Sequence, residues 1–246
     1  MGEVIAVLSG KGGTGKTSVC AGLATALADD QMRVLCVDCD VGLQNLDISL
    51  GLSDRGGLSF MDVCRGGYTL DQALRHPDFP DLAFLTAPVN CLPTQIDRGD
   101  FGRMLRRASG EFDYVFLDCA AGVDVMFSLT SSFADRCIVV TGPGPAAIRD
   151  AARVGELLDL QNKTDARLIV NRVSGKIASA LDMTVDDVMD ETGLPLLGVV
   201  PEDMNVTMAA AYGVPLLNYR GRSPAAKACR RIANRIQGIP EPINVR

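Results

Sequence analysis

The sequence predicts an α/β protein with a single doubly wound, mostly parallel sheet and helices on both faces. Three observations lead to this prediction. Short, continuously apolar runs recur along the chain, as expected for strands that are buried on both faces. Stretches of helical length separate these runs, and repeated strand–helix units form parallel sheets. The length of 246 residues suits one such unit, so we expect residues 1–246 to form one domain.

The predicted elements alternate along the chain. The runs predicted to be strands are residues 4–8, 34–37, 82–85, 115–117, 137–140, 168–170 and 196–200. The stretches predicted to be helices are residues 17–27, 97–107, 146–160, 184–192, 205–212 and 223–237. Residues 51–93 are the least regular, so apart from the strand at 82–85 we expect surface connections there, with one or two short helices. His76, the one histidine, is expected on a surface loop.

Composition limits the function. The net charge of −6 and the sequence pI near 4.8 argue against a broad DNA-binding surface, which would have to neutralise many phosphates. No apolar run approaches ~18 residues, and the N-terminus lacks the basic lead of a signal peptide. We therefore expect a cytoplasmic protein. Its eight cysteines are then expected to be reduced.

Residues 9–18, with the sequence SGKGGTGKTS, join the first predicted strand to the first predicted helix. The pattern G-x-x-x-x-G-K-[ST] is typical of a phosphate-binding loop, in which backbone N–H groups curl around phosphate oxygens at a helix N-terminus. Lys16 is expected to neutralise the β- and γ-phosphates, and the Thr17 hydroxyl to bind Mg²⁺. The residues expected to contact the nucleotide here are Gly12, Gly13, Thr14, Gly15, Lys16, Thr17 and Ser18.

Carboxylates follow two of the predicted strands. Asp38 and Asp40 end the second strand on the same side of it, and Asp118 ends the strand at 115–117. Beside phosphates, such carboxylates indicate Mg²⁺ and an attacking water. We expect Asp38 and Asp118 to bind the metal through water, and Asp40 to orient or deprotonate the attacking water. The sequence thus predicts Mg²⁺-dependent hydrolysis of a nucleoside triphosphate.

A second lysine, Lys11, precedes Lys16 by five residues and is not needed to hold a nucleotide within one subunit. The form K-G-G-x-G-K-T resembles the deviant phosphate loop of the MinD/ParA family of ATPases, and residues 38–47 resemble its first switch segment. The resemblance implies that Lys11 reaches across a two-fold interface to the partner's nucleotide, so that ATP closes a homodimer. It also implies that Lys11, Lys16 and Asp40 are the catalytic residues, with Asn45 supporting the switch.

Two later segments are similar to the base-binding segments of the same family. Asn171 and Arg172 end one strand as V-N-R, and Pro201 and Asp203 follow the next as V-x-P-x-D. The resemblance implies an adenine site, in which the Asn171 amide reads an edge of the base. GTP-specific relatives carry N/T-K-x-D at the first segment, so the expected cofactors are ATP and Mg²⁺.

The second switch departs from the family pattern. Ala120 stands where the family usually has proline, so we expect a looser turn there, with Gly122 still marking the bend. Cys39 and Cys119 each follow a metal-side aspartate and are expected to face one another. Small buried residues are the favoured interpretation of this pair, and a redox brake is the alternative.

The resemblance covers about residues 3–217 and implies a MinD-like switch that dimerises on ATP, regulates division-site placement and is released by partner-stimulated hydrolysis. A protein activator or division inhibitor is the expected partner. The alternative is a ParA-like ATPase for DNA partition or for positioning cargo or flagella, which would need a basic DNA-facing surface. Because the chain is acidic, we expect no DNA binding.

The C-terminal segment contains one predicted helix, at about 223–237, and a short tail, 238–246. The apolar stripe of this helix favours docking on the sheet, and it comprises Ala225, Cys229, Ile232, Ile236 and Ile239. MinD-like chains carry a further basic amphipathic helix, which a tail with two prolines cannot form. We therefore expect no direct membrane binding by this segment, and recruitment to the inner face of the membrane only through a partner.

Overall fold

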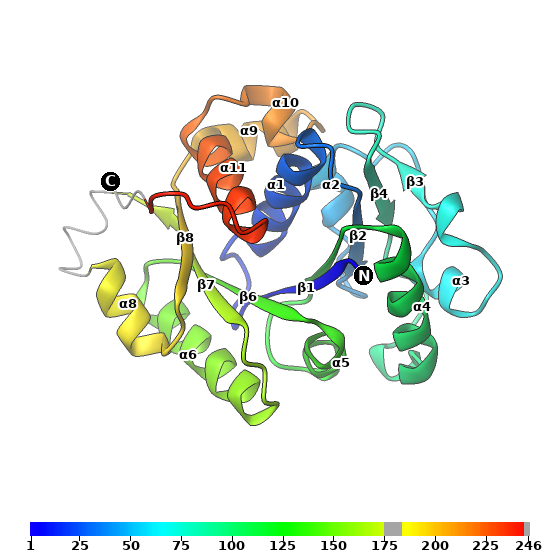
Figure 1. The fold of residues 1–246 in the computed structure, drawn as a ribbon, viewed down its shortest axis with the longest axis horizontal. Coiled ribbons are helices and arrows are strands. Elements are labelled where there is room, and N and C mark those ends of the chain that lie inside the picture. Colours follow the sequence, from blue (N-terminus) through cyan, green and yellow to red (C-terminus); the bar gives the residue numbers. More distant parts are fainter. Residues whose placement is uncertain (175–183, 244–246) are drawn as a thin grey trace.

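The computed structural model describes residues 1–174 and 184–243. A sheet of eight strands runs through the described part of the chain, with helices on both sides (Figure 1). The strand order is β3-β4-β2-β5-β1-β6-β7-β8, and all neighbours are parallel except β3 and β4. The predicted doubly wound, mostly parallel sheet is confirmed. The strands are β1 (Glu3–Leu8), β2 (Val34–Cys39), β3 (Leu74–Arg75), β4 (Leu82–Leu85), β5 (Tyr114–Cys119), β6 (Arg136–Thr141), β7 (Ala166–Val173) and β8 (Leu196–Pro201).

The helices form one layer on each face of the sheet. The first layer consists of α1 (Lys16–Asp29), α2 (Leu46–Leu50), α9 (Met204–Ala211), α10 (Leu216–Arg220) and α11 (Pro224–Ile236). The second consists of α3 (Phe60–Cys64), α4 (Arg98–Glu111), α5 (Val125–Phe133), α6 (Pro145–Leu160) and α8 (Val185–Thr192). Three-residue 3₁₀ turns occur at Leu70–Gln72 and Pro93–Gln95.

The strands are buried on both faces because each contributes to two cores. In β2, Cys36 packs in the core beneath α1, and Cys39 packs in the opposite core. The thiols of Cys36 and Cys39 therefore point to opposite faces of the sheet and do not form a pair. The central strand β1 lies between β5 and β6, so the carboxyl ends of β1, β2 and β5 open at one edge. Ligands of doubly wound sheets bind at such an edge.

Helix α11 packs against α1 and β8, as its apolar stripe predicts. A Cβ atom on Gly22 of α1 would lie 2.7 Å from the Sγ atom of Cys229, so a side chain at this position would separate the two helices. Ile232 is buried, but Ile239, which was assigned to the same stripe, is 47% exposed and lies beyond the end of the helix. The guanidinium of Arg235 donates to carbonyl oxygens of Leu197, Glu241 and Pro242, which ties the tail to α11 and β8. Residues 244–246 of the predicted tail lie outside the described residues.

The prediction for His76 is wrong. This residue is 3% exposed, because its Nδ1 atom accepts the backbone N–H groups of Asp78 and Phe79. The second ring nitrogen, Nε2, therefore carries the proton and donates to the Leu50 carbonyl at the end of α2, 2.8 Å away. Burial lowers the pKa of His76, which keeps the ring neutral. The residue joins the irregular region to α2.

Four elements were not predicted: β3, α5 and the five-residue helices α2 and α10. Strand β3 is only two residues long and pairs antiparallel with β4 at the edge of the sheet. Helix α5 follows β5, and its N-cap residue Asp124 accepts the N–H groups of Met126 and Phe127. An aspartate before an apolar stretch is a helix-start signal, so α5 was recognisable from the sequence. No helix in residues 1–174 or 184–243 is both long enough and apolar enough to cross a membrane.

Candidate nucleotide-binding site

The loop at residues 9–15 connects β1 to α1 at the carboxyl edge of the sheet. Gly13 and Gly15 have φ angles of 81° and 84°, in the left-handed region that favours glycine. Gly15 is required for a second reason, since a Cβ atom there would lie 2.3 Å from the Nδ2 atom of Asn171. No side chain caps the N-terminus of α1. The first N–H groups of the helix are therefore available to an anion.

Two residues at the end of β7 donate hydrogen bonds to carbonyl groups of this loop. The Asn171 amide donates from Nδ2 to the Thr14 carbonyl at 2.7 Å, and Asn171 is 6% exposed. Arg172 has a φ of 58° and donates from Nη1 to the Gly13 carbonyl at 3.1 Å. One N–H of this amide is used by the Thr14 carbonyl, and the amide retains its Oδ1 acceptor and its second N–H. Beside it is a cavity of about 350 Å³, lined by Gly15, Ser18, Asn171, Arg172, Pro201, Glu202, Asp203, Met204, Val206 and Thr207.

Asp38 and Asp118 lie side by side at the ends of β2 and β5, where they are register partners. Both are almost fully buried, at 0% and 1% exposure. Burial, together with the negative charge of Asp118, raises the pKa of Asp38 to about 7, although the backbone N–H groups of Asp40 and Leu46 favour its charged form. Two adjacent buried carboxylates are unfavourable unless a cation neutralises them.

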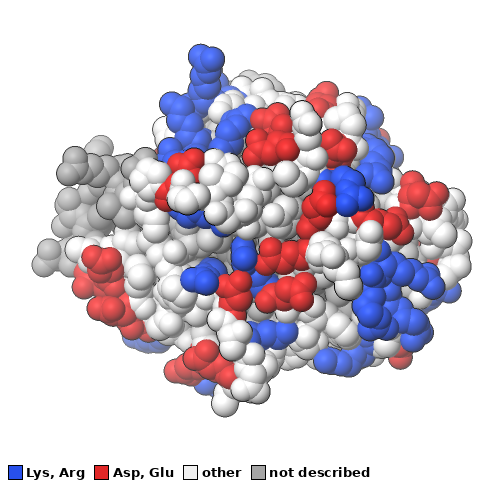
Figure 2. All heavy atoms as spheres, in the orientation of Figure 1, with Lys and Arg blue, Asp and Glu red and all other residues white. Residues whose placement is uncertain are grey.

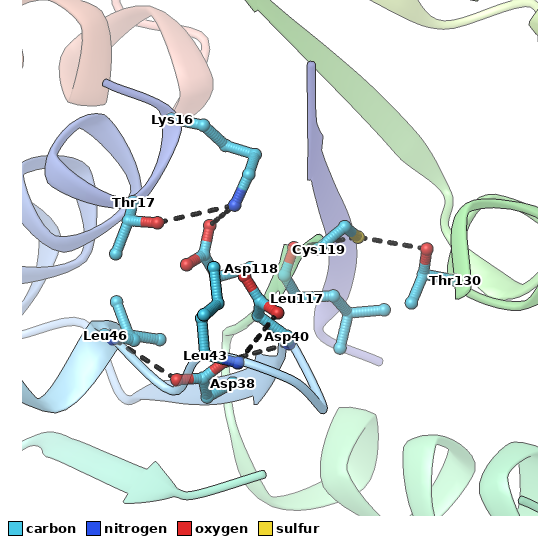
Figure 3. A network of polar contacts seen from close by, with 10 residues as sticks. All are labelled: Lys16, Thr17, Asp38, Asp40, Leu43, Leu46, Leu117, Asp118, Cys119 and Thr130. Carbon is cyan, nitrogen blue, oxygen red and sulfur yellow. Dashed lines mark hydrogen bonds and ion pairs between the residues drawn. The ribbon is translucent and has the colours of Figure 1, made fainter. Parts of the chain in front are cut away.

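Lys16 supplies one such cation. Its Nζ atom lies 2.7 Å from Oδ1 of Asp118 and 3.4 Å from Oγ1 of Thr17, as Figure 3 shows. Burial disfavours the charge on Lys16, but the Asp118 carboxylate outweighs this effect and raises the pKa of the lysine. The lysine assigned to the phosphates is therefore paired with the carboxylate assigned to the metal.

Asp40 lies just beyond β2, next to Asp38 (Figure 3). Its Oδ1 atom accepts the N–H groups of Gly42 and Leu43 at 3.3 Å each, which folds the chain into a turn. Asp40 lines a cavity of about 340 Å³ with the phosphate loop, Leu43, Asn45 and Ala121. The turn thus places a carboxylate in front of the loop, where an attacking water would need to be oriented.

The residues fit a nucleotide with Mg²⁺. Ser9 Oγ and Thr14 Oγ1 are buried at the loop without a hydrogen-bond partner in the described part of the chain. The hard oxygen ligands of Thr17, Asp38 and Asp118 suit Mg²⁺. Among residues 1–174 and 184–243, no three carboxylate, histidine or cysteine side chains form a metal-binding group. Mg²⁺ commonly keeps several waters and takes further ligands from phosphates, which suits a site with few protein ligands.

Asp203 has a structural role that the sequence did not indicate. Its Oδ1 atom accepts the N–H of Asn205 and so caps α9, and its Oδ2 atom accepts the N–H of Ala225 in the first turn of α11. One carboxylate thus joins two helices at the wall of the cavity beside Asn171. Pro201 lines the same cavity.

Lys11 is exposed at the tip of the loop. Large apolar side chains are also exposed around this edge of the sheet, in the segments that follow β2, β4, β5 and β8. They are Leu43 (73%), Val89 (78%), Leu92 (64%), Val123 (47%), Val125 (50%) and Met204 (72%). Such a concentration of exposed apolar groups is typical of a surface that another protein covers.

Cys39 and Cys119 are register partners at the ends of β2 and β5, as expected, and both are fully buried. The Cys119 thiol lies 3.0 Å from Oγ1 of Thr130. Burial raises the pKa of Cys119 to about 12 and raises that of Cys39 as well. Buried, protonated thiols are poor nucleophiles, which favours the structural interpretation of the pair.

The sequence matches the family described as the CobQ/CobB/MinD/ParA nucleotide binding domain over residues 5–216. It is 38% identical to the septum site-determining protein MinD of Bacillus subtilis (strain 168), and the match covers 100% of this chain and 92% of that protein. Two solved structures are similar over nearly their whole length. The MinC:MinD cell division protein complex of Aquifex aeolicus has a TM-score of 0.89 and 32% identity, covering 98% of each chain. The septum site-determining protein MinD of Pyrococcus horikoshii OT3, complexed with Mg-ADP, has a TM-score of 0.83 and 29% identity, covering 96% of each chain.

Proposed function

The chain belongs to the CobQ/CobB/MinD/ParA nucleotide-binding family, and we propose that it is a MinD-like, Mg²⁺-dependent ATPase that regulates division-site placement. ATP closes its dimer, and partner-stimulated hydrolysis opens it again. The observation that carries this proposal is the convergence at one sheet edge of the phosphate loop, the carboxylates of Asp38 and Asp118, and the exposed Lys11.

Each polar group has a distinct role. The N–H groups of residues 12–18 and the Lys16 ammonium bind the phosphates, which requires Lys16 to leave Asp118. Mg²⁺ neutralises the phosphate charge when it is bound. Thr17 would supply a hydroxyl to the metal, and Asp38 and Asp118 would hold it through water. Asp40 orients the attacking water and accepts its proton.

The base lies in the cavity between β7 and β8. One N–H of the Asn171 amide is bound to Thr14, and the Oδ1 acceptor of the same amide faces the base. An acceptor suits the exocyclic amino group of adenine and opposes the carbonyl oxygen of guanine. Arg172 and Pro201 form the walls, and Asp203 holds the wall helix α9 in place.

A second copy of the chain covers the carboxyl edge in the ATP state. Lys11 reaches from one protomer to the partner's nucleotide, and the exposed apolar side chains around it, such as Leu43 and Val123, become buried. The match to the Aquifex MinC:MinD cell division protein complex supports a protein partner, which is an activator or a division inhibitor in this proposal. The protein is cytoplasmic and reaches the inner face of the membrane through a partner. A ParA-like role in DNA partition or in positioning cargo or flagella has less support.

Two experiments test the proposal. Light scattering at high salt, where weak contacts between exposed charges are screened, should give a dimer with ATP alone. Equal dimerisation with ATP, with ADP and without nucleotide would contradict the switch. Deletion of the gene from its native cells should displace division septa, as seen by microscopy. Normal septa together with misplaced plasmids or flagella would instead favour the ParA-like role.

A further inference from the structure

Helices α4 and α8 expose opposite charges at the two ends of the molecule. Figure 2 shows Lys and Arg gathered over α4 at the right and Asp and Glu over α8 at the left. Both helices lie on the same face of the sheet, because their apolar sides share one core. The exposed residues are Arg98, Arg103, Arg106 and Arg107 on α4, and Asp186, Asp187, Asp190 and Glu191 on α8.

The charges on α4 are mostly unpaired. Arg103 pairs with Asp100, but Arg106 and Arg107 form no ion pair with any residue in the described part of the chain. Arg103 lies three and four positions before them, a spacing at which like charges destabilise a helix. Arg98 is the first residue of α4, where the helix dipole disfavours a cation. The positions of these arginines therefore destabilise α4 electrostatically.

Two ring contacts hold cations in this region without neutralising them. The guanidinium carbon of Arg98 lies 4.9 Å from the centre of the Phe133 ring, and that of Arg75 lies 5.3 Å from the Phe112 ring. A guanidinium that rests on a ring is already ordered, so less side-chain entropy is lost when a carboxylate binds to it.

Helix α8 carries acidic side chains and no basic ones, the reverse of the excess positive charge on α4. Asp186 and Asp190 are four residues apart, as are Asp187 and Glu191, and the helix contains no cation. The first-turn acids are explained, because the helix dipole favours them and Asp187 completes a capping box with Thr184. Asp190 and Glu191 lie in the last turn, where the dipole disfavours a carboxylate. An external cation would relieve this repulsion.

We propose that α4 of one copy of this chain docks against α8 of the next copy. Each helix supplies the charge that the other lacks, and this complementarity favours a second copy of this chain as the occupant of α4. The two patches differ, so the contact is heterologous and extends into a linear assembly. The charged residues do not line the nucleotide site, so the contact is independent of the ATP-dependent dimer.

Sedimentation velocity of the full chain without nucleotide tests the proposal over a range of protein concentrations. Exposed ion pairs are individually weak, so we expect a mass that rises with concentration at about 10 mM salt. The monomer should return at about 1 M salt, where the Debye length falls from about 30 to about 3 Å. A mass that is independent of concentration at low salt would overturn the proposal.

Neutralising variants identify the surfaces. Arg106→Gln/Arg107→Gln and Asp186→Asn/Asp190→Asn should each stay monomeric, while an equimolar mixture should form particles of two chains and no larger. The matched control, Arg220→Gln/Arg222→Gln, removes the same charge beside α10 and should assemble like the unmodified protein. Assembly lost equally in the control, or a mixture that forms longer chains, would refute the α4–α8 contact. Circular dichroism and ATP turnover, both expected to be unchanged, separate this result from misfolding and from failure of the proposed ATPase.

Discussion

The Nζ atom of Lys16 lies 2.7 Å from Oδ1 of Asp118, and the two side chains are 7% and 1% exposed. The pair joins the phosphate loop to the end of β5, 102 residues further along the chain. If the site binds Mg-ATP as proposed, Lys16 would leave Asp118 for the phosphates. The metal, held through water, would then supply the positive charge near this carboxylate.

Removal of Lys16 should affect stability as well as binding. Lys16→Ala leaves the buried Asp118 carboxylate without a counter-charge, so we expect a loss of about 3 kcal/mol in the unfolding free energy of the nucleotide-free protein at pH 8. ATP binding should be abolished. Urea denaturation and titration with a fluorescent ATP analogue measure the two effects. The double variant Lys16→Ala/Asp118→Asn should recover most of the stability but none of the binding, and equal instability of both variants would argue against the ion pair.

Lys11 should matter for dimerisation alone. It is exposed at the loop tip, so Lys11→Ala should bind ATP as a monomer with unchanged affinity. ATP-induced dimers should be lost, because the partner's nucleotide no longer receives this cation. Light scattering checks the mass, and Lys227→Ala, which removes another exposed lysine, is the control. Dimerisation of Lys11→Ala with ATP would show that the lysine does not act across the interface.

Asp40 should be required for hydrolysis and not for binding. Asp40→Asn keeps the shape of the side chain and the acceptor oxygen for Gly42 and Leu43. We expect turnover to fall about 10²-fold, because the amide cannot take the proton of the attacking water. Affinity for ATP and dimerisation should persist. Asp47→Asn makes the same change on α2 and should retain turnover, whereas full activity of Asp40→Asn would assign the water to another residue.

The sheet was predictable because strands buried on both faces must be continuously apolar, and such runs are visible in the sequence. The phosphate loop was predictable for a related reason, since its contacts are made by neighbouring backbone groups. Contacts between distant segments were not predictable. Nothing in the local sequence indicates that the Asn171 amide donates to Thr14, 157 residues away, or that Lys16 would pair with Asp118.

His76 illustrates a limit of local pattern reading. A histidine before a proline in an irregular segment is ordinarily exposed, and its burial depends on the carbonyl at the end of α2, 26 residues earlier. Asp203 likewise lies in a segment that resembles a base-binding motif. In the structure its carboxylate also accepts the backbone N–H of Ala225 in the first turn of α11, 22 residues later. Polar residues acquire such roles from tertiary contacts.

Thr14 offers a test of how the loop uses its side chains. The residue is 6% exposed, and its Oγ1 atom has no hydrogen-bond partner in the described part of the chain. Thr14→Val replaces this hydroxyl with a methyl group of similar size and should raise the unfolding free energy by about 1 kcal/mol. ATP should bind more weakly, because Thr14 Oγ1 is one of the two buried hydroxyls that the site leaves for a ligand. Unchanged ATP affinity of the more stable variant would show that the hydroxyl does not contact the nucleotide.

Asp203 should make stability depend on pH. Burial alone would raise the pKa of this carboxyl, but the N–H groups of Ala225 and Asn205 outweigh burial and lower it below the ordinary value of 3.8. A lowered pKa stabilises the fold above pH 3.8, and this contribution is lost as the pH falls through the folded-state pKa. Asp203→Asn keeps an acceptor for α9 but presents an amide N–H₂ to Ala225. We therefore expect the variant to be about 1–2 kcal/mol less stable at pH 7.

Urea denaturation of both proteins between pH 7 and pH 3 measures this effect. The difference should be constant down to about pH 4 and then shrink as Asp203 becomes protonated in the unmodified protein. Asp124→Asn is the matched control: Oδ1 of Asp124 alone accepts both N–H groups at the start of α5, and asparagine caps helices about as well as aspartate. That control should lose little stability at any pH. A loss at pH 7 that persists unchanged at pH 3 would mean that Asp203 stabilises the two helices through its shape and not through its charge.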